Sequence, residues 1–344
     1  MRLITGFALA GTAGFVMLAA SQSAFAQTTL SASSWVPPTH SLTKGVLVPW
    51  TQEVEKVTQG RVKFNVLPKA PMSPPSTFDG VRDGLVDLSY VTASYTPARH
   101  VLPKMPELSG GGSTAEINSV AYSRIHWKHF QQAGEYKGVK LLGVFTHGPG
   151  QMFLVKKPVK SLADLSGMKI RVGGGISEEL GRALGASPFV KPAPESYELL
   201  SSGVADGTFF PLESIKSFKL DKVVKYATFF PGGFYGSAFG FFMNEDKWNK
   251  LSKADQDAIL SISGEKLARL AGKSWDAADK EGLEAMKAAG VQITNASPAF
   301  IKEVQEKAEG VENDWFKQAA TRNVDGRKAL AEFRQELKNV AAGK

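Results

Sequence analysis

The 344-residue sequence contains no cysteine. Disulfide bridges and thiolate metal sites are therefore excluded, and stability has to come from buried apolar surface. The sequence also lacks the Gly-x-Ser-x-Gly elbow of hydrolases, the phosphate-binding loop and the Gly-x-Gly-x-x-Gly pattern of dinucleotide-binding folds. These absences argue against hydrolytic and nucleotide-dependent chemistry. A chain of this length is long enough to form two lobes, each with its own core.

Concentrated charge and clustered histidines are also missing. The chain has 41 basic and 33 acidic residues, but the lysines are scattered beside acidic residues and form no basic run interleaved with aromatics. A nucleic-acid partner is therefore not expected. Among the five histidines, His126 and His129 have helical i, i+3 spacing, but no third ligand accompanies them. We expect neither a metal site nor a cofactor.

Residues 1–26 have the pattern of a secretory signal peptide. A basic residue, Arg2, precedes an apolar run over residues 7–20, and Ala24-Phe25-Ala26 forms an A-x-A cleavage site. We expect the mature chain to begin at Gln27 and to be periplasmic; the alternative is an uncleaved anchor. No later apolar run approaches the length that crosses a membrane.

From residue 28 onward, segments with strand and helix patterns alternate, which is typical of layered α/β architecture. Two similar corners, residues 84–87 and 203–206, each close a helix before a strand, which suggests two similar lobes. After residue 244 the pattern is helical to the end, and Ser252 begins a capping box. The predicted strands are 28–33, 61–67, 88–91, 168–172 and 188–190. The predicted helices include 41–59, kinked at Pro49, then 78–83, 176–185 and one opening at 194.

The most informative segment is residues 161–175. Its apolar positions alternate with Lys169 and Arg171, which is the pattern of a strand with one buried face. Three glycines and an amphipathic helix follow. Ligands of open α/β sheets bind at the carboxyl ends of strands, and a guanidinium placed there can bind a carboxylate through two hydrogen bonds. The alternative is an ordinary surface arginine.

Several segments together resemble the periplasmic solute-binding proteins of tripartite ATP-independent periplasmic (TRAP) transporters. The segments at 161–172 and 203–207 are the specific ones, and those at 60–66, 79–88 and 244–251 support them. The resemblance implies an α/β, two-lobed periplasmic binding protein fold, with a long helix spanning both lobes and a ligand clamped between them. Lobe 1 is then residues 27–147 plus about 234–276, and lobe 2 is residues 148–233 plus about 277–344.

The resemblance also implies binding residues and partners. Arg171 corresponds to the carboxylate-binding arginine of the family, and membrane subunits of a transporter are the expected protein partners. This sequence departs from the family pattern at two positions. Gln151 stands where members that bind acidic sugars often carry a second arginine, and Phe210 stands where many members have an asparagine that contacts ligand. These departures favour a monocarboxylate with an apolar or aromatic body.

Further candidate contacts are aromatic and polar residues near the expected cleft. An aromatic side chain is more often part of the core, and His147 is either a ligand contact or a hinge residue. The remaining candidates are Trp35, Tyr95, Glu213 and Phe234. The expected function is capture of an organic acid without chemistry. The alternatives are a sugar-acid or dicarboxylate receptor, a receptor for another transporter class, and a periplasmic enzyme on the same scaffold.

Overall fold

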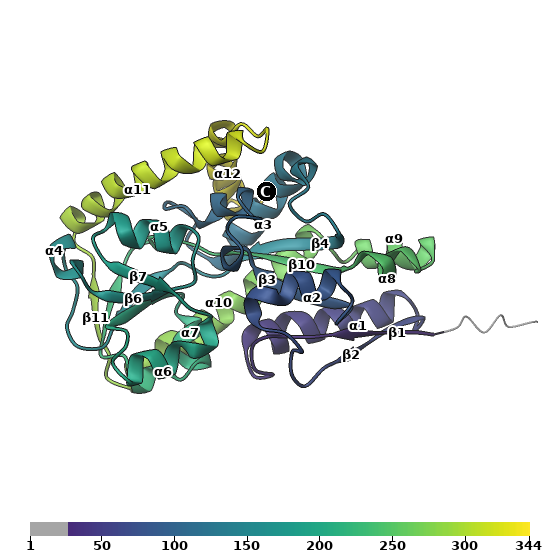
Figure 1. Ribbon diagram of the computed structural model, residues 1–344, viewed down its shortest axis with the longest axis horizontal. Coiled ribbons are helices and arrows are strands. Elements are labelled where there is room, and N and C mark those ends of the chain that lie inside the picture. The colour runs from purple at the N-terminus through teal and green to yellow at the C-terminus, as the bar shows by residue number, and fades with distance from the viewer. Residues whose placement is uncertain (1–26) are drawn as a thin grey trace, which may run out of the picture.

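The computed structural model describes residues 27–344, and these form two β-sheets arranged side by side along an elongated molecule (Figure 1). The predicted signal peptide lies outside the described residues. The first sheet has the order β2-β1-β3-β10-β4, and the second has the order β11-β9-β5-β8-β6-β7. The strands of the first sheet are β1 (Thr28–Ala32), β2 (Val62–Val66), β3 (Leu88–Thr92), β4 (Val139–Thr146) and β10 (Ala238–Asn244). Those of the second are β5 (Gln151–Leu154), β6 (Lys169–Val172), β7 (Ser187–Val190), β8 (Gly207–Phe210), β9 (Tyr226–Phe229) and β11 (Gln292–Asn295).

Helices cover both sheets, so the predicted α/β, two-lobed class is confirmed. Within residues 27–344, no helix is long and apolar enough to cross a membrane. The helices near the first sheet are α1 (Val48–Val57), α2 (Thr77–Arg82), α3 (Ala115–Ile125), α8 (Glu245–Asn249) and α9 (Lys253–Leu260). Those near the second are α4 (Leu162–Leu165), α5 (Ile176–Ala183), α6 (Ser196–Ser201) and α7 (Glu213–Ser217), and the chain ends with α10 (Glu265–Ala288), α11 (Pro298–Ala320) and α12 (Gly326–Ala341).

The chain crosses between the two sheets twice, each time through a short segment. β4 leads directly into β5, and β9 leads back into β10, which pairs antiparallel with both β3 and β4. The first crossing requires glycine, because a Cβ on Gly148 would lie 1.8 Å from Asp279 Oδ2 and one on Gly150 would lie 2.1 Å from the Tyr235 ring. The crossing strands therefore pack tightly against each other and against α10.

Three local expectations can be compared with the structure. The helix predicted over 41–59 starts at Ser41 and contains a π-helical turn (Thr43–Leu47) directly before α1, so Pro49 follows helical residues and its missing N–H leaves a carbonyl of that preceding turn without a helical donor. Ser252 caps α9 as predicted, accepting a hydrogen bond from the Asp255 amide at 3.1 Å. The expectation of helix from residue 244 to the end is wrong, because β11 pairs parallel with β9 at the sheet edge.

The C-terminal helices lie across the two lobes. α11 packs against α5, whereas α12 packs against α3 beside the first sheet. The lobe boundaries inferred from the resemblance stay a prediction.

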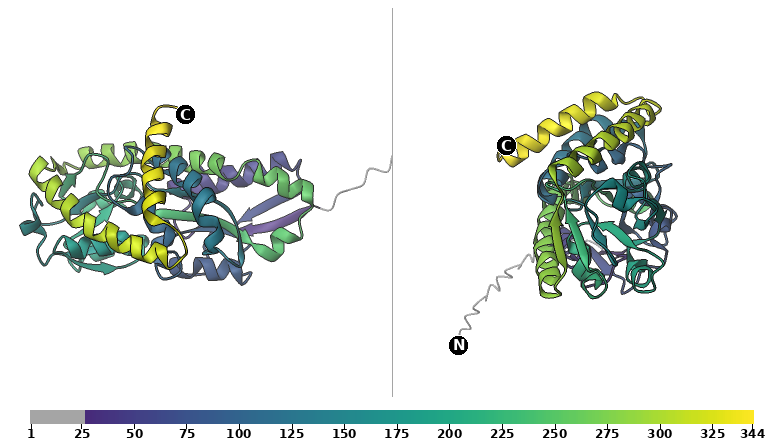
Figure 2. Two further views of the ribbon diagram at one scale, coloured as in Figure 1. Left: turned by 90° about the horizontal axis from the view of Figure 1, so that it is seen from above. Right: turned by 90° about the vertical axis from the view of Figure 1, so that its left-hand side faces the viewer.

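The predicted long spanning helix is α10, whose 24 residues extend about 36 Å. Figure 2 shows it running along one side of the molecule from one lobe to the other. Two glycines bring it close to both lobes. A Cβ on Gly272 would lie 2.3 Å from the Glu116 Cα of α3, and one on Gly282 would lie 2.0 Å from the Leu212 carbonyl oxygen before α7. The helix is therefore held directly against backbone at both ends.

The close approach at Gly282 predicts opposite effects for alanine there and at a helical glycine that has open space around it. Gly282→Ala should lower the free energy of unfolding by about 1–3 kcal/mol, because the new methyl group meets rigid backbone. The matched control is Gly310→Ala in α11, where a Cβ meets nothing within 4 Å; it should raise the free energy by up to about 1 kcal/mol through helix propensity. Thermal unfolding followed by circular dichroism checks both, and equal effects of the two substitutions would contradict this packing.

Candidate functional site

A cavity with about 500 Å³ of space between its walls, open solvent included, lies where the two sheets face each other. The ends of β3, β6 and β8 reach it, because Thr92, Arg171 and Phe210 stand at or next to the last positions of these strands. This is the strand-end position at which open α/β sheets bind ligands. Residues of both sheets therefore line one site.

Arg171 is the charged centre of this wall. Its side chain is 1% exposed, and its Nε and Nη2 donate to the Lys191 carbonyl at 2.9 and 2.6 Å. The guanidinium lies 4.3 Å from the centre of the Phe210 ring, in a cation–π contact. Glu195, the one acidic residue that raises its pKa, pairs with Lys191 at 3.6 Å. Arg171 thus has no carboxylate partner among the described residues.

Burial lowers the pKa of Arg171, but an arginine stays charged at any physiological pH. A buried charge without a counter-ion is costly to maintain, and an anion entering the cavity would relieve that cost. The site is therefore prepared for a negatively charged group.

Two tyrosines complete the polar end of the cavity. The Tyr95 hydroxyl accepts a hydrogen bond from the Ala193 amide at 2.8 Å, so its own proton remains available to donate. Burial raises the pKa of Tyr95 and of Tyr235, which keeps both hydroxyls protonated. The positive charge of Arg171 lowers the pKa of both hydroxyls, but by less than burial raises it. A guanidinium flanked by two hydroxyl donors matches the oxygens of one carboxylate.

The rest of the wall is mainly aromatic. Phe210 stacks on Phe218 at 5.9 Å, and the edge of Trp35 meets Tyr95 at 5.6 Å. The Trp35 Nε1 donates to the Tyr90 carbonyl, so this residue presents an apolar face. The other aromatic residues of the wall are Phe209, Phe239 and Trp275. Such a surface suits an apolar or aromatic body.

The structure brings five of the eight predicted binding residues to the cavity wall: Trp35, Tyr95, His147, Arg171 and Phe210. The other three do not line it. The Gln151 side-chain amide forms two hydrogen bonds with the Phe230 backbone. It donates to the Phe230 carbonyl at 3.1 Å and accepts from the Phe230 amide at 2.7 Å. Phe234 packs edge-on against Phe209 at 4.8 Å inside the core. Glu213 lies behind Ser214 and His40, which are themselves wall residues.

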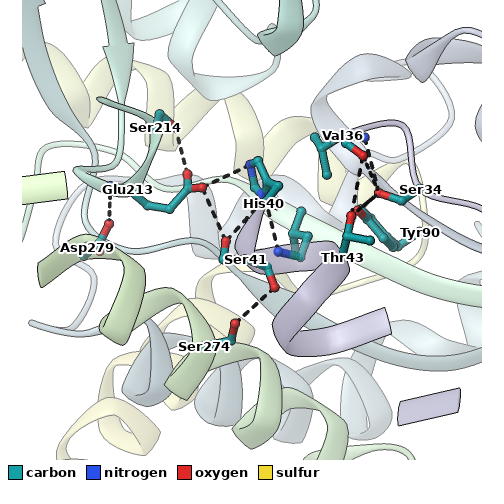
Figure 3. A network of polar contacts seen from close by, with 11 residues as sticks. Ser34, Val36, His40, Ser41, Thr43, Tyr90, Glu213, Ser214, Ser274 and Asp279 are labelled. Atoms are coloured by element: carbon teal, nitrogen blue, oxygen red, sulfur yellow. Dashed lines mark hydrogen bonds and ion pairs between the residues drawn. The ribbon is translucent and has the colours of Figure 1, made fainter. Parts of the chain in front are cut away.

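Glu213 is the centre of a polar network that joins three parts of the chain (Figure 3). His40 Nδ1 accepts the Leu42 amide at 3.1 Å, so Nε2 carries the proton and donates to Glu213 Oε1 at 3.1 Å. The Glu213 amide in turn donates to Asp279 Oδ1 of α10 at 2.7 Å. All three side chains are buried. The first lobe, the second lobe and α10 are therefore tied together beside the cavity.

A second connection lies on the other side of Arg171. Glu107 accepts the Ile176 amide at the start of α5 at 3.3 Å and the Ala238 amide at 3.1 Å. Burial raises the pKa of Glu107 to about 7. Nearby, Lys104 pairs with Glu179 of α5 at 2.7 Å. The glycine turn that follows Arg171 is therefore fixed to the first lobe.

Sequence reasoning missed several of these residues. Tyr235 has only a weak signal in the sequence, because it is an aromatic residue directly after the candidate Phe234. His40, Glu107 and Trp275 belong to no motif, and their partners are far away in the sequence. Only the folded chain shows that they meet at the site.

The buried His147 makes the free energy of unfolding depend on pH. Its Nδ1 contacts the Gly148 carbonyl, and burial lowers its pKa from 6.5 to about 4. Between pH 4 and 6.5 the unfolded chain binds more protons at this residue than the native protein, so acid reduces the free energy of unfolding. The advantage of the wild type over His147→Gln should therefore shrink by up to about 3 kcal/mol from pH 7 to 4. Urea unfolding of both proteins across this range checks it; a constant difference would contradict a neutral, buried His147.

Comparison with known proteins gives a consistent result. The family model for bacterial extracellular solute-binding proteins, family 7 (DctP), matches residues 32–319. The chain is 31% identical over 309 residues to the outer membrane transporter protein TsaT of Comamonas testosteroni, covering 90% of this chain and 91% of that protein.

Two solved structures are similar throughout. One is a TRAP periplasmic solute-binding protein from Bordetella bronchiseptica with bound (R)- and (S)-mandelate, at 46% identity and a TM-score of 0.89, covering 91% of this chain and 99% of that one. The other is a marine metagenome TRAP solute-binding protein specific for aromatic acid ligands, in complex with 3-hydroxybenzoate, at 31% identity and a TM-score of 0.85 with the same coverage. The chain therefore belongs to the DctP family, the extracytoplasmic solute-binding proteins of TRAP transporters, and the predicted family and periplasmic location are confirmed.

Proposed function

We propose that this protein captures an aromatic monocarboxylate between its lobes and delivers it unchanged to the membrane subunits of a TRAP transporter. The observation that carries the proposal is the buried Arg171 guanidinium, which rests on Phe210 and has no carboxylate partner among residues 27–344. In the expected complex the carboxylate accepts hydrogen bonds from Arg171 and Tyr95. The ring of the ligand lies against the aromatic wall.

The charge of the wall supports a single carboxylate. Arg171 is the one lysine or arginine among the residues that line the described cavity. Burial lowers the pKa of both His40 and His147, which keeps them neutral near pH 7. A second buried carboxylate would therefore have no cationic partner and a large desolvation cost. This favours a monocarboxylate over a dicarboxylate.

The relatives agree with this ligand class. The Bordetella bronchiseptica protein binds mandelate and the marine protein binds 3-hydroxybenzoate, and both ligands are aromatic monocarboxylates. We infer the same class here from this agreement together with the aromatic wall.

The enzyme alternative has one structural candidate, the Ser41–His40–Glu213 group. The Ser41 hydroxyl lies 3.3 Å from His40 Nδ1 and 3.4 Å from Glu213 Oε1, but Nδ1 already accepts the Leu42 amide at 3.1 Å. The Nδ1 lone pair is therefore shared with a backbone amide, and Ser41 does not line the cavity, so its hydroxyl does not face a bound ligand. These contacts, and the family of binding proteins, support capture without chemistry.

The ligand class can be tested by thermal unfolding with a panel of acids. Benzoate and mandelate should raise the melting temperature, since a ligand at one hundred times its Kd stabilises the native state by about 2.7 kcal/mol. Succinate and galactonate should leave it unchanged, because they lack an aromatic ring and the second carboxylate of succinate finds no cation. Stabilisation confined to dicarboxylates or sugar acids would overturn the proposed ligand class.

Arg171→Lys tests the anchor directly. Lysine keeps the charge but cannot form two parallel hydrogen bonds, so affinity for benzoate should fall by about 2–5 kcal/mol. The matched control is Arg182→Lys on the exposed face of α5, where the side chain pairs with Glu178; it should bind as the wild type does. Isothermal titration calorimetry measures all three proteins. Wild-type affinity in Arg171→Lys would show that another residue holds the carboxylate.

A further inference from the structure

His147 occupies a particular place in the cavity wall. It follows the last residue of β4, where the chain crosses to the second sheet, and its backbone amide donates to the Ser237 carbonyl at 3.2 Å. Its ring is 5.5 Å from Tyr235 and 5.9 Å from Trp275, two rings that also line the cavity. The imidazole is therefore held among wall residues.

The hydrogen bonds of His147 fix its tautomer. The Gly148 carbonyl is an acceptor only, so the Nδ1 that contacts it carries the proton. Burial lowers the pKa to about 4, so the ring is neutral near pH 7. Nε2 then bears a lone pair, on the side of the ring away from Gly148. It has no hydrogen-bond partner among the contacts of residues 27–344, so it can accept a hydrogen bond from a donor in the cavity.

Most other polar side chains of this wall have hydrogen-bond partners within the protein, as Ser177 has in the Gly174 carbonyl. Thr92 contacts the Ser94 hydroxyl at 2.8 Å and the Ser237 hydroxyl at 2.7 Å. Ser214 and His40 both donate to Glu213. Arg171 and Tyr95 are donors at the carboxylate end. Nε2 of His147 is thus a pure hydrogen-bond acceptor in this wall, because the proton of the ring is on Nδ1.

We propose that His147 is a specificity residue that accepts a hydrogen bond from a hydroxyl group of the ligand, so that the protein prefers hydroxylated aromatic acids to their parent acids. This rests on the proposed function, since it assumes that Arg171 holds the carboxylate. The ligand then spans the cavity, with its anion at Arg171 and its hydroxyl at Nε2. A parent acid makes no hydrogen bond to Nε2, so it binds with lower affinity than the hydroxylated acid.

The test uses pairs of acids that differ by one hydroxyl group. Calorimetry compares benzoate with 2-, 3- and 4-hydroxybenzoate, and phenylacetate with each enantiomer of mandelate. In the wild type at least one hydroxylated acid should bind about tenfold tighter than its parent. In His147→Phe that ratio should fall to about one, whereas His147→Gln, whose amide oxygen can accept, should retain part of it.

A purely structural role for His147 gives a different result, because both members of a pair then weaken equally and the ratio is unchanged. Tyr235→Phe is the second control, since its hydroxyl lies near the Arg171 charge. It should weaken both members and leave the ratio intact. A ratio that persists in His147→Phe, or disappears only in Tyr235→Phe, would overturn the assignment.

A measurement on the wild type avoids dependence on the folding of the variants. Nitrogen-15 NMR of labelled histidine should show the non-protonated nitrogen of His147 shifting when the hydroxylated acid binds but not when the parent acid binds. Equal shifts would contradict the proposal. If every parent acid binds in an Arg171-dependent way but no hydroxyl increases affinity, this inference fails and the proposed function stands. If no aromatic acid binds, both fail.

Discussion

The uncompensated charge of Arg171 is the constraint on which the site depends. The side chain is almost fully buried, and what holds it in place is the Lys191 carbonyl and the face of Phe210 rather than an acidic residue. Carbonyl and ring contacts offset only part of the cost of removing a guanidinium from water. An incoming carboxylate offsets the remaining desolvation cost, because the low polarity of the cavity strengthens its ion pair with Arg171.

Closure of the lobes is tied to the same site by two separate connections. On one side His40 of the first lobe donates to Glu213 of the second. On the other side Glu107 accepts the amide of Ile176, a few residues after Arg171. Both connections are buried, so an open arrangement would expose them to water. A ligand that bridges the lobes would add to them and shift the population toward the closed form.

The sequence predicted much of the fold because its signals were local. Alternation around Arg171 and the cap at Ser252 depend on residues that are neighbours in the chain. The β11 strand was missed because it is a four-residue edge strand whose pairing partner, β9, lies more than sixty residues earlier. Its pairing depends on tertiary contact rather than on a local pattern.

The site residues likewise fall into two groups, those with a local sequence signal and those defined by long-range contacts. Arg171 and Phe210 could be identified because they stand at strand ends within recognisable segments. Gln151 was expected at the site, but its amide has two backbone partners in Phe230, and no local pattern reveals them. His40 and Glu213 are 173 positions apart in the numbering, and their hydrogen bond exists only once the lobes meet. Long-range contacts of this kind are set by topology.

A crystal structure of the protein grown with mandelate would test the role of Arg171 most directly. We expect a closed molecule in which both carboxylate oxygens lie within hydrogen-bond distance of the Arg171 guanidinium and the phenyl ring contacts Phe210. A ligand bound in this cavity with its carboxylate away from Arg171, or bound elsewhere on the protein, would contradict this expectation.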